Sequence, residues 1–157
     1  MEIPDLKTTL PFLDAGVTQV AIVVPDIHRA VAMYHGVFGI GPWHIYTYER
    51  PLVQEMTYHG APADYKMRVA LSYLGPTRIE LIEPLEGETV YADFVAEHGY
   101  GVHHFGVLVD DMEAALAAAR EAGIEMLMDG AGFGLDGDGH YAYLDTEALI
   151  GVTLELI

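Results

Sequence analysis

The sequence contains no cysteine, which excludes disulfide bonds, thiolate metal sites and cysteine nucleophiles. Any metal ion must therefore be held by nitrogen and oxygen atoms. Basic residues are also scarce, since 7 lysines and arginines stand against 24 acidic residues and give a formal net charge of -17. A surface with this charge repels phosphates, so we expect no nucleic-acid partner.

Long apolar runs are missing as well, although 52% of the residues are hydrophobic. No run approaches the roughly 18 to 20 residues needed to cross a membrane. The first residues, MEIPDLKTTL, show neither the basic region nor the apolar region of a signal peptide. We therefore expect a cytoplasmic protein without a membrane partner, and its 157 residues suit a single structural unit.

The chain contains an internal repeat. VTQVAIVVPDIHRAV (17–31) aligns without a gap with VHHFGVLVDDMEAAL (102–116). Each segment reads as a β-branched strand, an aspartate suited to cap a helix, and an amphipathic helix. The later segment RIELIEP (78–84) also resembles VTLELI (152–157). The repeat predicts a duplicated module in which each half has a strand, a helix and about three further strands.

These boundaries divide the chain into four regions. We expect an N-terminal extension over residues 1–16, a first module over 17–84, a linker helix region over 85–101 and a second module over 102–157. The linker predicts a short helix around 90–97. Chance similarity between short apolar segments is the competing explanation of the repeat.

Strand alternation predicts which side chains turn away from the helices. In the first strand Val20 and its alternate neighbours face the helix, which leaves Gln19 on the other face. In GVHHFGVLVDD the same rule places His103 on the helix side and His104 opposite, so only one of the two adjacent histidines can face a common site.

Alternation also turns Glu80 and Glu155 away from the helices, so four polar residues occupy equivalent places on one face: Gln19, Glu80, His104 and Glu155. One imidazole, two carboxylates and one amide oxygen are a plausible shell for a divalent metal ion. Taken singly, each is more simply a solvated or strand-edge residue. Their coincidence by repeat and by alternation favours metal binding.

The segment 41–66 is longer than a strand pair needs and is rich in aromatic rings, which could form a pocket for a small-molecule substrate. The predicted pocket residues are Trp43, Tyr46, Tyr48 and Tyr58 from this segment and Tyr143 from the approach to the last strand. Packing in the core or in a dimer is the competing explanation.

From about Val17 to Ile157 the chain resembles the vicinal oxygen chelate superfamily, which includes glyoxalase I, methylmalonyl-CoA epimerase, extradiol dioxygenases and drug-sequestering resistance proteins. The resemblance implies an α+β fold of paired βαβββ modules, whose mixed sheets curl around a central cavity with metal ligands on the first and last strand of each module. The order Gln, Glu, His, Glu is similar to the ligand set of zinc-type glyoxalase I. The GVHH strand is more similar to methylmalonyl-CoA epimerase, in which the second histidine binds the metal.

The chain departs from the patterns of both enzymes at positions that would determine the substrate. Where glyoxalase I has an arginine and an asparagine for glutathione, this chain has Val23 and Pro84. The strand YKMRVALSYL lacks the carboxylate base that the epimerase uses. We therefore carry over neither substrate.

The resemblance implies an enzyme that binds one divalent metal ion (Zn, Ni, Co, Mn or Fe) and catalyses proton-transfer isomerisation, epimerisation or lyase chemistry on a small carbonyl compound. It also implies Glu155 or Glu80 as the base, and a homodimer. A metal-independent small-molecule-binding protein of the resistance type is the alternative. An iron ring-cleaving dioxygenase comes third, because Gln19 stands where that enzyme has a histidine.

Overall fold

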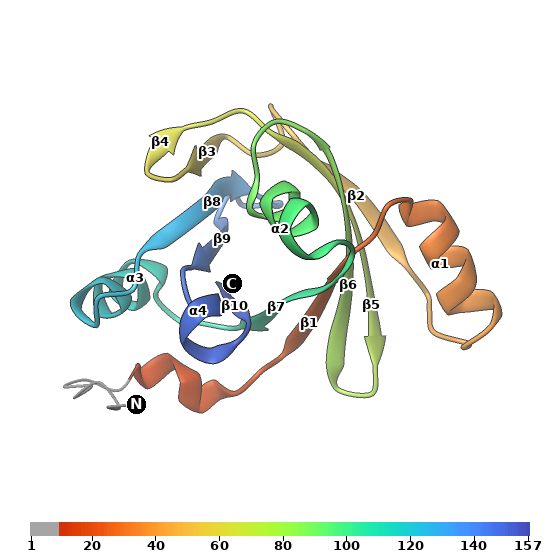
Figure 1. Cartoon of the computed structure of the whole chain (residues 1–157), viewed down its shortest axis with the longest axis horizontal. Coiled ribbons are helices and arrows are strands. Elements are labelled where there is room, and N and C mark those ends of the chain that lie inside the picture. Colours follow the sequence, from red (N-terminus) through yellow and green to blue (C-terminus); the bar gives the residue numbers. More distant parts are fainter. Residues whose placement is uncertain (1–9) are drawn as a thin grey trace.

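The computed structural model describes residues 10–157, which are organised around one sheet of ten strands (Figure 1). The strands are β1 (Gln19–Val23), β2 (His44–Tyr48), β3 (Glu55–Tyr58), β4 (Ala61–Pro62), β5 (Lys66–Leu74), β6 (Thr77–Glu86), β7 (Gly101–Val107), β8 (Met126–Phe133), β9 (Gly139–Leu144) and β10 (Thr153–Leu156). The helices are the 3₁₀ helix η1 (Pro11–Ala15) and the α-helices α1 (Ile27–Gly36), α2 (Val90–His98), α3 (Met112–Glu121) and α4 (Glu147–Ile150). Within residues 10–157, no helix combines the length and the hydropathy required to span a membrane.

The strand order shows the two halves of the repeat. It runs β2-β5-β6-β1-β7-β10-β9-β8-β3-β4, with the first strands of the two halves, β1 and β7, antiparallel at the centre. Each central strand pairs in parallel with the last strand of its own half, β1 with β6 and β7 with β10. The prediction of an α+β fold built from paired βαβββ modules with a curled mixed sheet is confirmed (Figure 1).

The segment between β2 and β5 departs from the simple repeat. Its strand β3 leaves the first half and pairs with β8 of the second half, with Glu55 opposite Ala131 and Tyr58 opposite Met128. The short strand β4 then pairs with β3 at the edge of the sheet. This crossing connects the two halves through backbone hydrogen bonds.

Matching aspartates begin the matching helices. The side chain of Asp26 accepts a hydrogen bond of 2.9 Å from the backbone N–H of Arg29 at the start of α1, and Asp111 accepts one of 2.9 Å from Ala114 at the start of α3. These contacts satisfy helix N–H groups that have no partner within the helix. The predicted capping role of both aspartates is confirmed. The linker region contains α2, capped by Thr89 and close in extent to the helix expected around 90–97.

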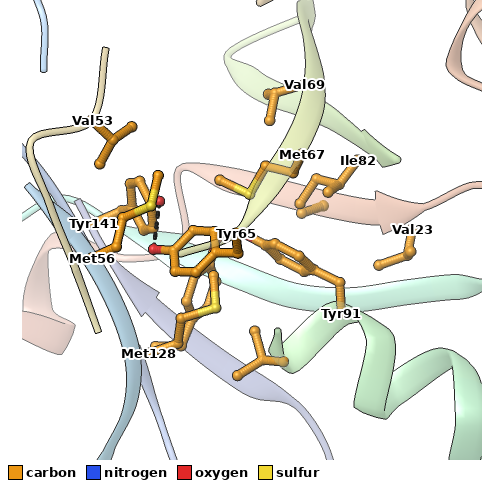
Figure 2. Close-up of a cluster of buried hydrophobic side chains, with 13 residues drawn as sticks. Val23, Val53, Met56, Tyr65, Met67, Val69, Ile82, Tyr91, Met128 and Tyr141 are labelled. Atoms are coloured by element: carbon orange, nitrogen blue, oxygen red, sulfur yellow. Dashed lines mark hydrogen bonds between the residues drawn. The ribbon is translucent and has the colours of Figure 1, made fainter. Parts of the chain in front are cut away.

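Helices and strand alternation divide the core between the two faces of the sheet. On the outer face α1 packs on Val20, Ile22 and neighbouring residues, and α3 packs on Leu154 and Leu156. On the concave face α2 lies within the curve of the strands and brings Tyr91 into a separate cluster (Figures 1 and 2). That cluster holds the following buried residues: Ala21, Val23, Val53, Met56, Tyr65, Met67, Val69, Ile82, Val90, Tyr91, Met128, Tyr141 and Tyr143. The four predicted metal ligands share this concave face.

Candidate metal-binding active site

Four polar side chains meet on the concave face at the centre of the sheet. Gln19 lies on β1, Glu80 on β6, His104 on β7 and Glu155 on β10, which are the four strands that the repeat makes equivalent. Their exposed fractions are 1%, 9%, 0% and 4%. The structure therefore brings together, within one chain, all four residues that the sequence singled out.

The distances inside the group are those of direct contact. His104 Nε2 lies 3.2 Å from Oε2 of Glu80 and 3.0 Å from Oε2 of Glu155. The Nε2 atom of Gln19 donates to the same two carboxylate oxygens, at 3.1 Å and 2.7 Å. The two glutamates come from opposite halves of the chain, and the imidazole lies between them.

These donors fit a divalent cation. Glu80, His104 and Glu155 each offer one ligand atom, and these three atoms lie within 4.8 Å of one another. Imidazole nitrogen and carboxylate oxygen suit zinc and its neighbours in the first transition row. Two buried carboxylates also require a compensating positive charge, because desolvated like charges repel strongly.

Burial and charge shift the titration of the cluster in a consistent direction. Burial raises the pKa of Glu80, and the negative charge of Glu155 raises it further. Burial alone would lower the pKa of His104, but the charges and hydrogen bonds of Glu155 and Glu80 outweigh burial and raise it to about 9. Without a metal ion, a proton on this imidazole supplies the positive charge that the carboxylates need.

A tyrosine pair supports Glu155 from the other side. The hydroxyl of Tyr143 donates a hydrogen bond of 2.8 Å to Oε1 of Glu155, and it lies 2.5 Å from the hydroxyl of Tyr91 on α2. Because Oε1 is held by Tyr143, the other oxygen, Oε2, is the one directed at His104 and Gln19. Burial raises the pKa of both tyrosines well above the usual value, so both remain donors.

The prediction that His103 lies on the helix side of the sheet is wrong, because β7 contains a bulge. Ala21 of β1 pairs with His104, but the next residue, Ile22, pairs with Val102, so His103 has no counterpart on β1. A β-bulge inserts one unpaired residue and breaks the strict alternation of faces. Both histidines therefore turn to the concave side.

In that position His103 supports His104. The Nδ1 atoms of the two rings lie 2.9 Å apart, and His103 packs edge-on against Tyr91 and Phe94 of α2. Burial, followed by the neighbouring charge on His104, lowers the pKa of His103 to about 3, which keeps its ring neutral. With Nε2 of His104 directed at the two carboxylates, its Nδ1 is the atom in contact with His103, which therefore supports the orientation of the ring.

A small cavity of about 100 Å³ opens beside the four side chains. Gln19, Glu80 and Glu155 line it together with Arg78. The remaining wall is apolar or aromatic and consists of Tyr48, Met67, Val69, Leu71, Phe133, Tyr141, Tyr143 and Ile157. A cavity with a few converging polar groups in an apolar wall is typical of a small-molecule site.

Only Tyr48 and Tyr143 of the predicted pocket residues line this cavity. Trp43 instead packs against Tyr34 of α1 and donates a hydrogen bond of 2.7 Å to the carbonyl of Ile40. Tyr46 lies on the edge strand β2 with 46% of its surface exposed. Tyr58 is carried to the other half by the crossing of β3, where its hydroxyl donates to Asp93. The prediction is therefore wrong for these three residues: Trp43 precedes β2 and packs toward α1, Tyr46 lies at the exposed edge of the sheet, and Tyr58 follows β3 to the other half.

Sequence reasoning missed Arg78. It precedes Glu80 by two residues on β6, so alternation places both on the same face, and this signal could have found it. A second, larger hollow of about 350 Å³ lies beside α3 and is lined by His59, Arg120 and mainly apolar residues. It contains none of the four converging side chains, so the chemistry is placed at the smaller cavity.

The chain belongs to the glyoxalase/bleomycin resistance protein/dioxygenase superfamily, since the sequence profile of that superfamily matches residues 18–143. Methylmalonyl-CoA epimerase from Mus musculus is 28% identical over 138 residues, which are 87% of this chain and 69% of the mouse protein. Ethylmalonyl-CoA/methylmalonyl-CoA epimerase from Cereibacter sphaeroides is 31% identical over 115 residues, 71% of this chain and 73% of that protein. The crystal structure of methylmalonyl-CoA epimerase from Mycobacterium tuberculosis has the same fold, with a TM-score of 0.65 at 23% identity over 99% of this chain and 91% of that one. These relatives support an epimerase-like enzyme of the superfamily.

Proposed function

We propose that this protein is a divalent-metal-dependent enzyme that moves a proton next to a carbonyl group of a small substrate, in an epimerisation or isomerisation. The observation that carries the proposal is the buried contact of His104 with both Glu80 and Glu155, at 3.2 Å and 3.0 Å. A buried cluster of this kind is costly unless it serves binding or catalysis, and perturbed titratable groups beside a cavity are typical of active sites.

In this proposal the metal ion, which can be Zn, Ni, Co, Mn or Fe, is held by Gln19, Glu80, His104 and Glu155. When bound, such an ion stabilises the negative charge that develops on a carbonyl oxygen as the adjacent C–H proton leaves. The protein supplies the fixed ligands, the base and a water-poor cavity.

We assign the base to Glu155, with Glu80 as the alternative. On β5 the residues that line the cavity are Met67, Val69 and Leu71, none of which can accept a proton. The base must therefore be one of the two glutamates that line the cavity. Glu155 is favoured because Tyr143 orients it by a hydrogen bond to Oε1. Glu80 lies across the site, on the strand from the other half, and could exchange a proton on the opposite side of a substrate.

The substrate is proposed only as a small carbonyl compound. The curated relatives are named for acyl-CoA thioesters. The formal charge of -17 does not favour the phosphates of coenzyme A, so we treat a CoA thioester as one candidate to be tested.

The test follows hydrogen exchange in D₂O. Zinc-, nickel- and cobalt-loaded protein is incubated with methylmalonyl-CoA and with small carbonyl acids, and loss of the α-proton is followed by ¹H NMR. The proposal expects metal-dependent exchange, about 10²- to 10⁴-fold slower in Glu155→Gln because a general base contributes about that much. Folded, metal-loaded protein that exchanges no α-proton of any compound in the panel would overturn it.

Metal analysis separates the alternatives. A resistance-type binding protein would purify and bind ligands without a stoichiometric metal, and His104→Ala would leave its ligand affinity unchanged. A ring-cleaving dioxygenase would consume oxygen with catechols when loaded with iron. We expect stoichiometric metal in the wild type, loss of it in His104→Ala, and no oxygen uptake.

We further propose that the chain forms a homodimer and acts in the cytoplasm. Sedimentation velocity of the purified protein tests the first point, and a single species of 17.2 kDa would contradict it.

A further inference from the structure

Arg78 holds a distinctive place beside the cluster. It lies on β6 two residues before Glu80, is partly buried and lines the cavity. Its Nε atom donates a hydrogen bond of 2.5 Å to Oε1 of Gln19. Among the residues that line this cavity, Arg78 is the only lysine or arginine.

Arg78 also lacks an acidic partner in the part of the chain that the structure describes. Lys66 pairs with Glu49 at 2.9 Å, and Arg68 pairs with Glu83 at 3.0 Å. Within residues 10–157, no ion pair within 4.0 Å forms on Arg78. Among the described residues, the one side-chain hydrogen bond that Arg78 makes is to the neutral amide of Gln19. A guanidinium carries five N–H donors, so donors remain for another acceptor.

Metal binding would change the amide that Arg78 contacts. In this structure the NH₂ group of Gln19 faces the carboxylates and its oxygen faces Arg78. Only the oxygen of an amide can ligate a cation, so Gln19 must turn that oxygen to the ion. Its NH₂ group would then face the guanidinium, donor against donor. With a metal ion held by the Gln19 oxygen, Arg78 would lack the acceptor that it has here and would be available to another one.

We propose that Arg78 binds a carboxylate of the substrate, so that the site selects small carbonyl compounds that carry a carboxylate group. This inference rests on the proposed function and names its substrate class. Guanidinium and carboxylate match in charge and in their paired hydrogen-bond geometry. One guanidinium balances the single charge of a carboxylate. A phosphate group would bring close to two negative charges toward Glu80 and Glu155, which favours the carboxylate.

Calorimetric titration of the zinc-loaded protein with three acids tests the proposal. The acids share a 2-hydroxy acid group, which would chelate the metal ion, and differ in the group at the far end, which would meet Arg78. Malate adds a second carboxylate, 2-hydroxybutyrate adds a methyl group, and 3-phosphoglycerate adds a phosphate. We expect the wild type to bind malate about tenfold or more tightly than 2-hydroxybutyrate, as loss of a charged hydrogen-bonded pair predicts. Tighter binding of 3-phosphoglycerate than of malate would overturn the choice of carboxylate.

Variants of Arg78 distinguish recognition of the substrate carboxylate from support of the metal site. Arg78→Met should reduce the affinity for malate to the level of 2-hydroxybutyrate without weakening zinc binding, and Arg78→Lys should restore part of the preference. Arg29→Met removes the same charge from the exposed face of α1 and should change neither affinity.

Failure of the role proposed for Arg78 can be distinguished from failure of the proposed function. If Arg78→Met weakens zinc and both acids together, Arg78 only positions Gln19 and the inference is overturned. Equal affinity of the zinc-loaded wild type for malate and 2-hydroxybutyrate overturns it as well, while the proposed function stands. A wild type that binds no divalent metal overturns the proposed function together with the inference.

Discussion

Tyr143 donates a hydrogen bond of 2.8 Å from its hydroxyl to Oε1 of Glu155, and both side chains are buried. Tyr91 on α2 contacts the same hydroxyl at 2.5 Å, so the linker helix takes part in holding a glutamate of the last strand. The orientation of Glu155 thus depends on segments far apart in the chain.

Tyr143→Phe removes this hydrogen bond and keeps the ring. A hydrogen bond to a charged group contributes about 1.5–3 kcal/mol, so we expect the exchange rate constant to fall about 10- to 100-fold. The protein should stay folded by circular dichroism. Tyr73→Phe, at a position that is 63% exposed, is the matched control and should have no effect. An unchanged rate in Tyr143→Phe would show that Glu155 needs no such support.

Gly106→Ala tests the packing beneath Gln19. A Cβ at this position on β7 would lie 2.8 Å from Cβ of Gln19 and 2.8 Å from Cδ1 of Ile157. Since both neighbours line the cavity, the variant should displace Gln19 and weaken metal binding about tenfold or more, as changes next to metal ligands commonly do. Competition with a chelating dye measures this affinity. Gly36→Ala, where nothing lies within 4 Å, should leave it unchanged.

Metal removal should lower the melting temperature, because Glu80 and Glu155 then face each other without the ion. A metal present at about 100 times its dissociation constant adds about 2.7 kcal/mol to the free energy of unfolding, which for a domain of this size corresponds to a shift of about 5–10 °C. Differential scanning calorimetry before and after chelation measures the shift. His104→Ala should show little or none, and a shift of equal size in that variant would place the metal elsewhere.

The metal-stripped protein should lose stability as the pH rises. The pKa of His104 is raised from 6.5 to about 9 in the folded state, so the folded protein binds this proton more tightly than the unfolded chain. The stabilisation is fully present below about pH 6.5 and is lost as the pH rises through about 9. The raised pKa of Glu80 acts in the same direction.

Urea unfolding between pH 6 and 9 measures this slope. His104→Gln, which cannot be protonated, should be much less dependent on pH over the same range. A metal-stripped wild type that gains stability toward pH 9 would contradict a raised pKa of His104.

Much of the site could be predicted from the sequence because strand alternation and the repeat are local properties. Gln19 and His104 occupy the same place in the aligned segments, and Glu80 and Glu155 occupy matching places in the last strands. Once the two halves pack symmetrically, equal positions on equivalent strands must meet at the centre of the sheet. The same alternation would have placed Arg78 beside Glu80.

Tertiary structure alone decided the rest, because it depends on pairing between distant segments. The bulge that turns His103 to the concave side exists only in the register of β7 against β1. Tyr58 left the predicted pocket because β3 pairs with β8 of the other half. The donor that faces Glu155 and the acceptor that faces Arg78 belong to one amide, whose orientation is set by residues 59 and 136 positions away in the chain. Sequence determined which side chains share a face, whereas the packing of the two halves determined which atoms touch.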